Sequence, residues 1–350
     1  MIDLPFGSIT DVPGITVGHH QRAGRGWQTG TTAIIVESGA TPGVDVRGGG
    51  PGTRETDALH PQNLIQEIHG ICLTGGSAYG LAAAHGVMEW LEDRGLGFPI
   101  GLMNGSPQVV PVVPAAVIFD LGRGGSPTNR PDATFGSKAA GNARRSQERW
   151  GSVGAGTGAR AGGLQGGVGT ASTTVRLADT ESGGDSDIEI TVGALAVANP
   201  NGSVIDPATG LPWEPCGTWL RRPVADERHA LIAALTGQAA LHLNTTIGVV
   251  ATSARLDKAE ASKMASVAHD GLARAVRPAH SMTDGDTIFG LAVGATNLPV
   301  VARHVALNAI LKAASETFAA ACTHAVLSAS TIGEAVAYSD VCRSVYRSSR

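Results

Sequence analysis

Asn244-Thr245-Thr246-Ile247-Gly248-Val249-Val250-Ala251-Thr252 places two hydroxyl side chains directly before a short apolar run. Two β-branched residues ahead of Ile-Gly-Val-Val are typical of a buried strand, so an ordinary strand is the simplest interpretation. The same residues also permit chemistry. If the chain is cut before Thr245, the freed α-amine, with an unperturbed pKa of about 7.7–8.0, can act as general base for the hydroxyl of the same residue.

A second segment, downstream, carries two carboxylates around one glycine. It reads Arg277-Pro278-Ala279-His280-Ser281-Met282-Thr283-Asp284-Gly285-Asp286-Thr287-Ile288-Phe289, so Asp284 and Asp286 come just before another apolar strand. In isolation, Asp-Gly-Asp is most often a solvated turn. The pair therefore gains a functional interpretation only together with the Asn-Thr-Thr segment.

Several shorter motifs occur upstream. They are Ile9-Thr10-Asp11-Val12-Pro13-Gly14-Ile15-Thr16-Val17-Gly18-His19, Val46-Arg47-Gly48-Gly49, Leu73-Thr74-Gly75-Gly76-Ser77-Ala78-Tyr79-Gly80-Leu81, Gly154-Ala155-Gly156-Thr157-Gly158-Ala159 and Asn199-Pro200-Asn201-Gly202. In order and spacing, over nearly the whole chain, the motifs and the two segments resemble the DmpA-like aminopeptidases. That family comprises L-aminopeptidase/D-esterases, β-peptidyl aminopeptidases and nylon-oligomer hydrolases, all self-cleaving proteins with an N-terminal nucleophile.

The resemblance implies an α/β fold, an αββα layered sandwich of the N-terminal-nucleophile type, whose central strands bring residue 245 into the middle of the layers. It implies one domain over residues 1–350, cut into chains 1–244 and 245–350 that stay packed together. In the family the nucleophile lies seven residues before the Thr of Val-Ala-Thr. That position is Thr245, the attacked carbonyl belongs to Asn244, and Thr246 is the alternative nucleophile.

Three further polar residues belong to the implied site. Asn199 matches the family's asparagine that donates to the developing oxyanion, although a turn-former before Pro200 is the simpler interpretation of the residue alone. Asp284 and Asp286 match the acidic pair of the nylon-oligomer branch, which orients the nucleophile's amine, whereas other branches carry Ser and Glu there. A carboxylate raises the pKa of that amine and burial lowers it, so we expect an amine that titrates near neutrality.

Two positions depart from the nylon-oligomer pattern. That branch has Lys where this chain has Gln165, and Tyr where this chain has Phe119. The first change removes an ammonium and is expected to slow maturation. The second removes one oxyanion donor and leaves Asn199 and backbone N–H groups to do that work, so we expect an enzyme that is slow or narrow in its substrate range.

A glycine pair before a helical pattern offers a second possible anion site. Leu81, Ala84, Met88 and Leu91 recur at helical spacing, which predicts a helix over Ser77 to Asp93. Gly75, Gly76 and Ser77 would then supply an N-cap serine and free N–H groups that could hold an anion or oxyanion. A plain capped helix is the alternative.

The composition excludes several classes of function. The 350 residues are 42% hydrophobic and only 16% charged, with a net charge of −4 and no basic excess, which argues against nucleic acid or an anionic membrane as partner. No secretory signal is visible after Met1, and the longest apolar run, Val109 to Phe119, is too short to span a bilayer. We therefore expect a soluble, cytoplasmic protein.

No cofactor or metal is expected. The four cysteines, Cys72, Cys216, Cys322 and Cys342, show no CxxC spacing and no neighbouring histidines at metal-ligand intervals, so buried thiols are predicted. The glycines from Gly154 to Gly163 follow a helix-like segment, Ser137 to Trp150, rather than a strand. No acidic residue follows at the expected distance, so this is not a dinucleotide fingerprint.

Strands and helices alternate along the chain. Strands are predicted at Thr31 to Val36, His69 to Leu73, Ala115 to Phe119, Ile188 to Val197, Thr246 to Thr252 and Thr287 to Val293. Besides Ser77 to Asp93, helices are predicted at Asp257 to Arg277 and, with a wide apolar face, at Val301 to Ala329. Pro200 to Gly237 looks like an irregular surface excursion before the cleavage site.

The favoured function is a self-processing amide hydrolase that releases N-terminal residues from small peptides or amides, in a homo-oligomer of tetramer size or larger as the resemblance suggests. Three alternatives stay open: an endo-acting amide hydrolase like the nylon-oligomer enzymes, an acyltransferase like the ornithine acetyltransferases, and a self-processed but inactive scaffold. The acyltransferases cleave after Ala at a different local motif, whereas Asn244 precedes Thr245 here.

Overall fold

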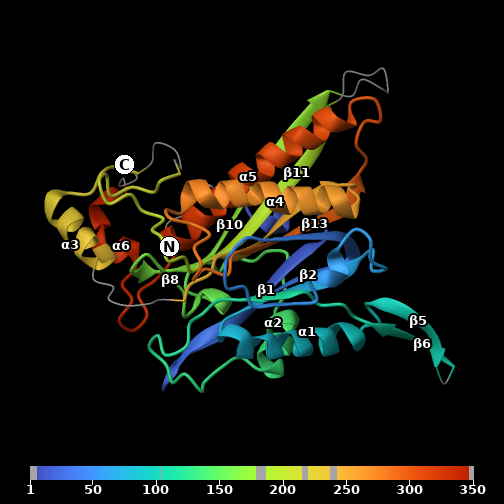
Figure 1. Cartoon of the computed structure of the whole chain (residues 1–350), viewed down its shortest axis with the longest axis horizontal. Helices are drawn as coiled ribbons and strands as arrows, with labels where there is room; N and C mark the ends of the chain where they lie inside the picture. Colours follow the sequence, from blue (N-terminus) through green and yellow to red (C-terminus); the bar gives the residue numbers. More distant parts are fainter. Residues whose placement is uncertain (1–5, 104, 179–186, 215–219, 237–242, 347–350) are drawn as a thin grey trace.

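Two β-sheets lie face to face between two layers of helices (Figure 1). The computed structural model describes residues 6–103, 105–178, 187–214, 220–236 and 243–346. Strand β2 (Trp27–Val46) belongs to both sheets, because its first half pairs with β1 and β4 and its second half pairs with β13. The pairing with β4 shifts register between Ile35 and Ala40, where Gly39 has a φ of 77° that favours glycine.

The remaining strands fall on either side of β2. The first sheet adds β1 (Ile15–Gly24), β3 (Thr53–Arg54), β4 (Ile68–Thr74) and β7 (Ala115–Val117). The second sheet runs β10 (Gly167–Ala178), β11 (Asp187–Ala198), β12 (Ile247–Ala254) and β13 (Thr287–Thr296), and then the end of β2. Two hairpins lie outside these sheets, β5 (Phe98–Met103) with β6 (Ser106–Val110) and β8 (Arg160–Ala161) with β9 (Leu164–Gln165).

Successive side chains of β12 enter two different apolar clusters, so this strand is buried on both of its faces. Ile247, Val249 and Ala251 belong to the apolar cluster between the sheets, whereas Val250 belongs to the cluster under the helices. Side chains in a strand point alternately to its two faces, so a continuous apolar run is what a doubly covered strand requires. Full burial of each such Val or Ile contributes roughly 1.5–3 kcal/mol.

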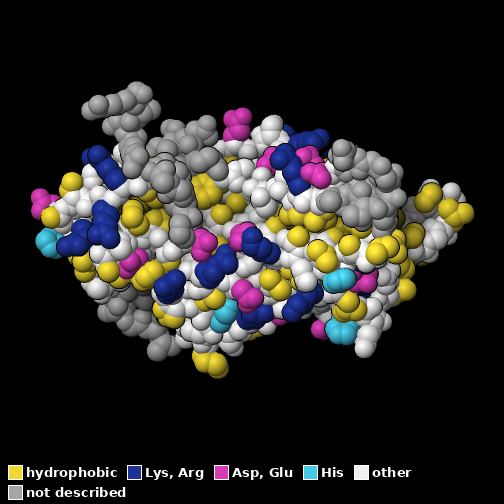
Figure 2. Space-filling model, turned by 90° about the horizontal axis from the view of Figure 1, so that it is seen from above, with side chains coloured by type: hydrophobic (Ala, Val, Ile, Leu, Met, Phe, Trp, Pro, Cys, Tyr) yellow, Lys and Arg dark blue, Asp and Glu magenta, His cyan; other side chains and the backbone are white. Residues whose placement is uncertain are grey.

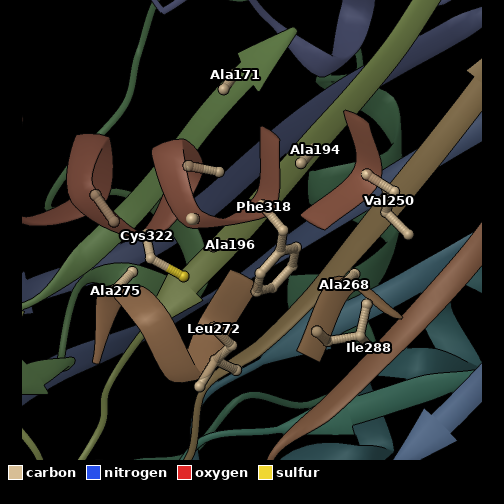
Figure 3. Packing of buried hydrophobic residues seen from close by; sticks show 14 of the residues in the cluster. Ala171, Ala194, Ala196, Val250, Ala268, Leu272, Ala275, Ile288, Phe318 and Cys322 are labelled. Carbon is tan, nitrogen blue, oxygen red and sulfur yellow. The ribbon is translucent and has the colours of Figure 1, made fainter. Parts of the chain in front are cut away.

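Helices α4 (Lys258–Ala275) and α5 (Arg303–Leu327) cover the second sheet, and α1 (Ala83–Glu92) and α2 (Ala133–Gly141) cover the first. Figure 3 shows Phe318 and Cys322 of α5 with Leu272 of α4 in the cluster under the upper helices. By length and composition α5 could cross a membrane, but 56% of its apolar window is buried inside the fold. Its packing against β10 and β11 accounts for that apolar face.

Strand β12, helix α4 and strand β13 form a crossover that positions the site. Helix α4 begins after Asp257, whose side chain accepts from the Glu260 N–H while Glu260 accepts from the Asp257 N–H. The crossover brings β13 back parallel to β12, with Ile247 opposite Thr287. The segments that precede the two strands therefore lie side by side.

Several sequence-based boundaries were wrong. Ser77 does not cap an α-helix, because it follows Gly76 with a φ of 87° and begins a 3-10 helix, Ser77–Ala82, before α1. The helix-like segment up to Trp150 is helical only to Gly141. The excursion before residue 237 contains a regular helix, α3 (Ala225–Thr236). Strands β1 and β10 were not predicted.

Short elements complete the chain. They are the 3-10 helices Ile9–Asp11, Asp57–Leu59, Gly154–Gly156 and Arg343–Val345 and the helix α6 (Tyr338–Val341). Cys72, Cys322 and Cys342 are buried free thiols, as predicted, and burial raises the pKa of each. Cys216 lies outside the described residues.

Candidate active site

The parallel pairing of β12 and β13 brings the two decisive segments together. Asn244 and Asp284 form a parallel bridge three residues before β12 and β13 begin. Thr245 is 5% exposed and lies beside the Asp-Gly-Asp turn. Both segments precede strands, so their backbone groups are not used up by the sheet and can bond to each other.

The Thr245 hydroxyl lies against the carbonyl that precedes it. Its Oγ1 donates to the Asn244 carbonyl oxygen. The Gly285 N–H lies 3.2 Å from the same carbonyl oxygen and 3.2 Å from Thr245 Oγ1. If the hydroxyl attacks Asn244, negative charge develops on that oxygen, and the Gly285 N–H is already aimed at it.

The acidic pair is buried and fully engaged, so it is not a solvated turn. Asp284 and Asp286 are each 1% exposed. Asp286 Oδ1 accepts from the Thr246 N–H at 2.7 Å, and Oδ2 accepts from the His280 N–H at 3.1 Å and bonds His280 Nδ1 at 2.8 Å. Asp284 Oδ2 accepts from the N–H and the hydroxyl of Ser281 at 2.9 and 2.6 Å. Asp286 therefore holds the residue after Thr245, and Asp284 holds the start of the acidic turn at Ser281.

A glycine run supports the turn from behind. The Gly50 N–H donates to the Asp284 carbonyl at 2.8 Å, and the Arg47 N–H donates to the Asp286 carbonyl at 3.0 Å. A Cβ on Gly48 would lie 2.2 Å from the Asp286 nitrogen. Only glycine allows this close backbone approach, which gives the Val-Arg-Gly-Gly motif a structural role.

Asn199 contributes both its backbone and its side chain. Its carbonyl accepts from the Thr245 N–H at 2.9 Å. Its side-chain Oδ1 accepts from Arg123 Nη1 at 2.5 Å and from the Arg160 N–H at 2.9 Å, while Nδ2 has only a long contact of 3.4 Å to the Phe119 carbonyl. Because the oxygen is held on two sides, the amide orientation is fixed and the NH₂ group is the end left to donate.

Arg123 is a site residue that was missed from sequence. It is 7% exposed, and its Nη2 donates to the Leu243 carbonyl at 2.9 Å and to Asn244 Oδ1. Burial, and then the positive charge of Arg160, lowers the pKa of Arg123 to about 10, so it stays protonated at neutral pH. It lies in the glycine-rich turn Leu121-Gly122-Arg123-Gly124-Gly125, where a single arginine carries no functional signal.

His280 is the second missed residue. Besides its bonds to Asp286, its ring contacts that of His269 with centroids 4.9 Å apart. His269 Nε2 bonds the Asp45 carbonyl at 3.0 Å, and burial lowers the pKa of His269 to about 4. The Ala-His-Ser sequence before the acidic pair was a possible signal, because a histidine near two carboxylates is a common partner for one of them.

The Gly75-Gly76-Ser77 segment does not offer the free donors that were predicted. The three N–H groups donate to the Gly30 carbonyl, Asp120 Oδ1 and the Ile118 carbonyl, respectively. Asp120 is buried, and burial raises its pKa to about 6. The segment thus packs between Asp120 and the first sheet. Because the N–H groups of these three residues are already hydrogen-bonded, they are not free to bind an oxyanion as predicted.

The two departures from the nylon-oligomer pattern have defined positions. Gln165 is fully buried, and its Nε2 donates to the Ala159 carbonyl at 3.0 Å and to neighbouring loop carbonyls. Phe119 lies at the site, with the Arg123 guanidinium 5.6 Å from its ring centroid.

Thr246 Oγ1, the alternative nucleophile, is buried without a hydrogen-bond partner among the described residues. Within those residues, no three His, Cys, Asp or Glu side chains gather in a way that could hold a metal ion.

Comparison with known proteins places this geometry in a family. The model of peptidase family S58 matches residues 7–337. An "uncharacterized aminopeptidase" of Mycobacterium tuberculosis is 45% identical and covers 95% of this chain and 97% of its own length. A 6-aminohexanoate-oligomer endohydrolase of Kocuria is 30% identical, covering 87% of this chain and 85% of its own length. The L-aminopeptidase D-Ala-esterase/amidase of Ochrobactrum anthropi, described as a variant of the Ntn hydrolase fold, superposes with a TM-score of 0.70 at 20% identity, covering 98% of this chain and 95% of its own.

Proposed function

This chain belongs to peptidase family S58, and from that premise we propose that it is a self-processing amide hydrolase whose nucleophile is the hydroxyl of Thr245. The observation that carries the proposal is the Thr245 hydroxyl on the Asn244 carbonyl, with the Gly285 N–H on both oxygens. An ordinary strand needs neither contact.

Maturation would proceed in two steps. Thr245 Oγ attacks the Asn244 carbonyl carbon, and the C–N bond breaks as the nitrogen takes the proton, which leaves an ester between Asn244 and the Thr245 hydroxyl. Water then hydrolyses the ester to the Asn244 carboxylate and a free Thr245 hydroxyl. Gly285 stabilises the oxyanion of the first step, since its N–H already lies 3.2 Å from that oxygen.

Cleavage would convert the Thr245 nitrogen into an α-amine that can act as the base. The Asn199 carbonyl already lies 2.9 Å from this nitrogen, and Asp286 holds the next N–H at 2.7 Å. Both contacts remain when the preceding bond is broken, so the amine would stay directed at its own hydroxyl. The Asn199 NH₂ group is the side-chain donor for the oxyanion of the substrate.

The substrate class proposed is a small peptide or amide whose N-terminal residue is released. In the precursor, the Asn244 N–H donates to the Thr283 carbonyl at 3.1 Å, beside the buried Asp284. A free ammonium at this place would meet an acceptor and a negative charge, which is what an aminopeptidase needs at the acyl side.

We also propose a cytoplasmic homo-oligomer, of tetramer size or larger. Hairpin β5–β6 projects from the body of the molecule (Figure 1) and exposes Leu102, Met103 and Ile100 by 74%, 51% and 42%. Figure 2 shows hydrophobic side chains gathered at this end, whereas Lys and Arg lie interspersed with Asp and Glu over the rest of the face. An apolar projection of this kind suits contact with another copy. The molar mass measured by light scattering tests the proposed oligomer, and the mass of a monomer would contradict it.

Hydrolysis of aminoacyl p-nitroanilides by the purified protein tests the enzymatic proposal. We expect turnover from compounds with a free amine, and a large loss when the same amine is acetylated. Equal or faster cleavage of the acetylated compound would favour the second candidate, an endo-acting amide hydrolase. That candidate is supported by the relative named 6-aminohexanoate-oligomer endohydrolase and by the acidic pair. A processed chain without turnover of either compound would favour an inactive scaffold.

A further inference from the structure

Arg123 divides its hydrogen bonds between two parts of the site. Nη1 donates to Asn199 Oδ1, whereas Nη2 donates to the Leu243 carbonyl and to Asn244 Oδ1. All three acceptors are neutral amide oxygens, and two of them belong to the residues just before the bond that Thr245 would cut. One nitrogen of the buried guanidinium, Nη2, therefore bonds only to the two residues that become a new chain end after cleavage.

Asn244 is itself the acyl residue of that bond, and each of its polar groups has a partner. Its N–H donates to the Thr283 carbonyl at 3.1 Å, its carbonyl accepts from the Gly285 N–H at 3.2 Å, and its side-chain oxygen accepts from Arg123. Asn244 is only 2% exposed, but Leu243 is 45% exposed. The surroundings of Asn244 thus form an enclosed subsite that opens to solvent on the Leu243 side.

We propose that this subsite becomes the acyl-side specificity pocket of the mature enzyme, and that Arg123 selects substrates whose N-terminal residue carries an oxygen on its γ carbon. Asparaginyl and aspartyl residues have that oxygen where Asn244 has its own. The inference rests on the proposed function, because the same hydroxyl must attack both the precursor and the substrate. A substrate carbonyl reached by that hydroxyl lies where the Asn244 carbonyl lies.

The energetics favour selection by this contact. Once Asn244 has left the subsite, Nη2 of the buried guanidinium no longer has its former acceptors. Leaving a buried charged donor unpaired costs free energy. A leucyl residue is close to asparaginyl in shape but brings no acceptor. A hydrogen bond to a charged donor then corresponds to a preference on the order of 10- to 100-fold in kcat/KM.

The test compares the p-nitroanilides of asparagine, aspartic acid and leucine with the matured wild-type protein. We expect kcat/KM for the asparaginyl or the aspartyl compound to exceed that for the leucyl compound by at least about tenfold. In Arg123→Met, which keeps an unbranched apolar stem but has no N–H donors, this ratio should fall towards one. Arg303→Met is the control, since Arg303 pairs with Glu260 in the first turn of α4 and should keep the wild-type ratio.

Loss of Asn199 positioning in Arg123→Met would lower all rates together, so only the ratio reports on selectivity. If Arg123→Met is not cut, inhibition of the wild type decides the matter: free L-asparagine should inhibit more strongly than L-leucine. Equal turnover of the three compounds, or equal inhibition by the two amino acids, would overturn the inference and leave the hydrolase proposal standing. No turnover of any p-nitroanilide would instead remove the proposed function.

Discussion

The start and the middle of β12 are both buried, but opposite kinds of interaction hold them. At its start, Asn244, Thr245 and Thr246 are at most 5% exposed and bond to Thr283, Asn199 and Asp286. Near its middle, Val250 packs with Ile288 and Phe318 in an apolar cluster under α4 and α5. The start of the strand depends on directed hydrogen bonds, and its middle depends on apolar area removed from water.

This difference separates chemistry from stability within one strand. A buried polar network stabilises little in net terms, because each hydrogen bond replaces one to water, but it fixes the positions of the bonded groups. Apolar packing stabilises the fold more, but it is non-directional and fixes the positions of reacting atoms less. We therefore expect substitutions at the start of β12 to abolish reactions in a folded protein, and substitutions at its middle to weaken a protein that still reacts.

The largest effect is expected from Thr245→Ala. Without the hydroxyl, the chain should stay uncut and turnover should fall by about 10⁴-fold or more, the scale on which removal of a nucleophile acts. Thr246→Ala is the matched control, since its Oγ1 has no partner among the described residues. Gel electrophoresis and p-nitroanilide assays measure both. A Thr245→Ala protein that still cuts, or a Thr246→Ala protein that does not, would move the nucleophile.

In the apolar cluster at the middle of β12, Phe318→Ala should lower the free energy of unfolding by about 3–5 kcal/mol. The ring is fully buried and packs so closely on β12 that a Cβ on Gly248 would lie 2.6 Å from it. Turnover per folded molecule should stay close to wild type at low temperature. Urea titration gives the stability, and Leu64→Ala, at a side chain 72% exposed, is the control. A loss of turnover without a loss of stability would break the separation.

Acid should weaken the same helical layer through His324. Burial lowers the pKa of His324 to about 4 and outweighs the opposite effect of the Thr170 carbonyl, which lies 2.9 Å from Nδ1, so the folded protein holds the ring neutral at neutral pH. The unfolded chain takes up a proton near pH 6.5, whereas the folded chain does so only near pH 4, so stability is lost as pH falls between these values. The loss is up to about 3 kcal/mol. Urea titrations at pH 7.5 and 4.5 should show a smaller difference in His324→Gln, and an unchanged difference would contradict this assignment.

A smaller effect is expected from Asp286→Asn. The substitution keeps the volume of the side chain but removes a charge that accepts from Thr246 and His280, so maturation or turnover should slow by about 100-fold while the fold remains. Asp284→Asn should act in the same direction through Ser281. Time courses of cleavage after purification, with circular dichroism as the check on folding, measure this. Wild-type rates in both variants would return the turn to a structural role.

Much of the fold followed from sequence because local patterns agreed with it. The apolar run after Thr246 and the run after Asp286 formed strands β12 and β13, and the helical period between them formed α4. A strand, a helix and a strand in this order predict a parallel pair, which brings Asp284 to Asn244. The family resemblance supplied the layers, which local patterns alone do not specify.

The remainder depended on contacts between distant segments. Arg123 meets Asn244 across 121 positions, and no periodicity or spacing in the sequence marks that meeting. Gly76 takes a φ of 87° and the following Ser77 a φ of 52°, so the expected serine cap gave way to a junction on Asp120. Propensity identifies an N-cap only while the backbone before the helix stays extended.

The first residue of the smaller fragment tests the proposed self-cleavage most directly. N-terminal sequencing of the purified protein, separated under denaturing conditions, should give two sequences, one of them beginning Thr-Thr-Ile-Gly-Val from Thr245. That result would show that the contact between the Thr245 hydroxyl and the Asn244 carbonyl is the geometry of a reaction. A single uncut chain, or a fragment that begins at any other residue, would contradict it.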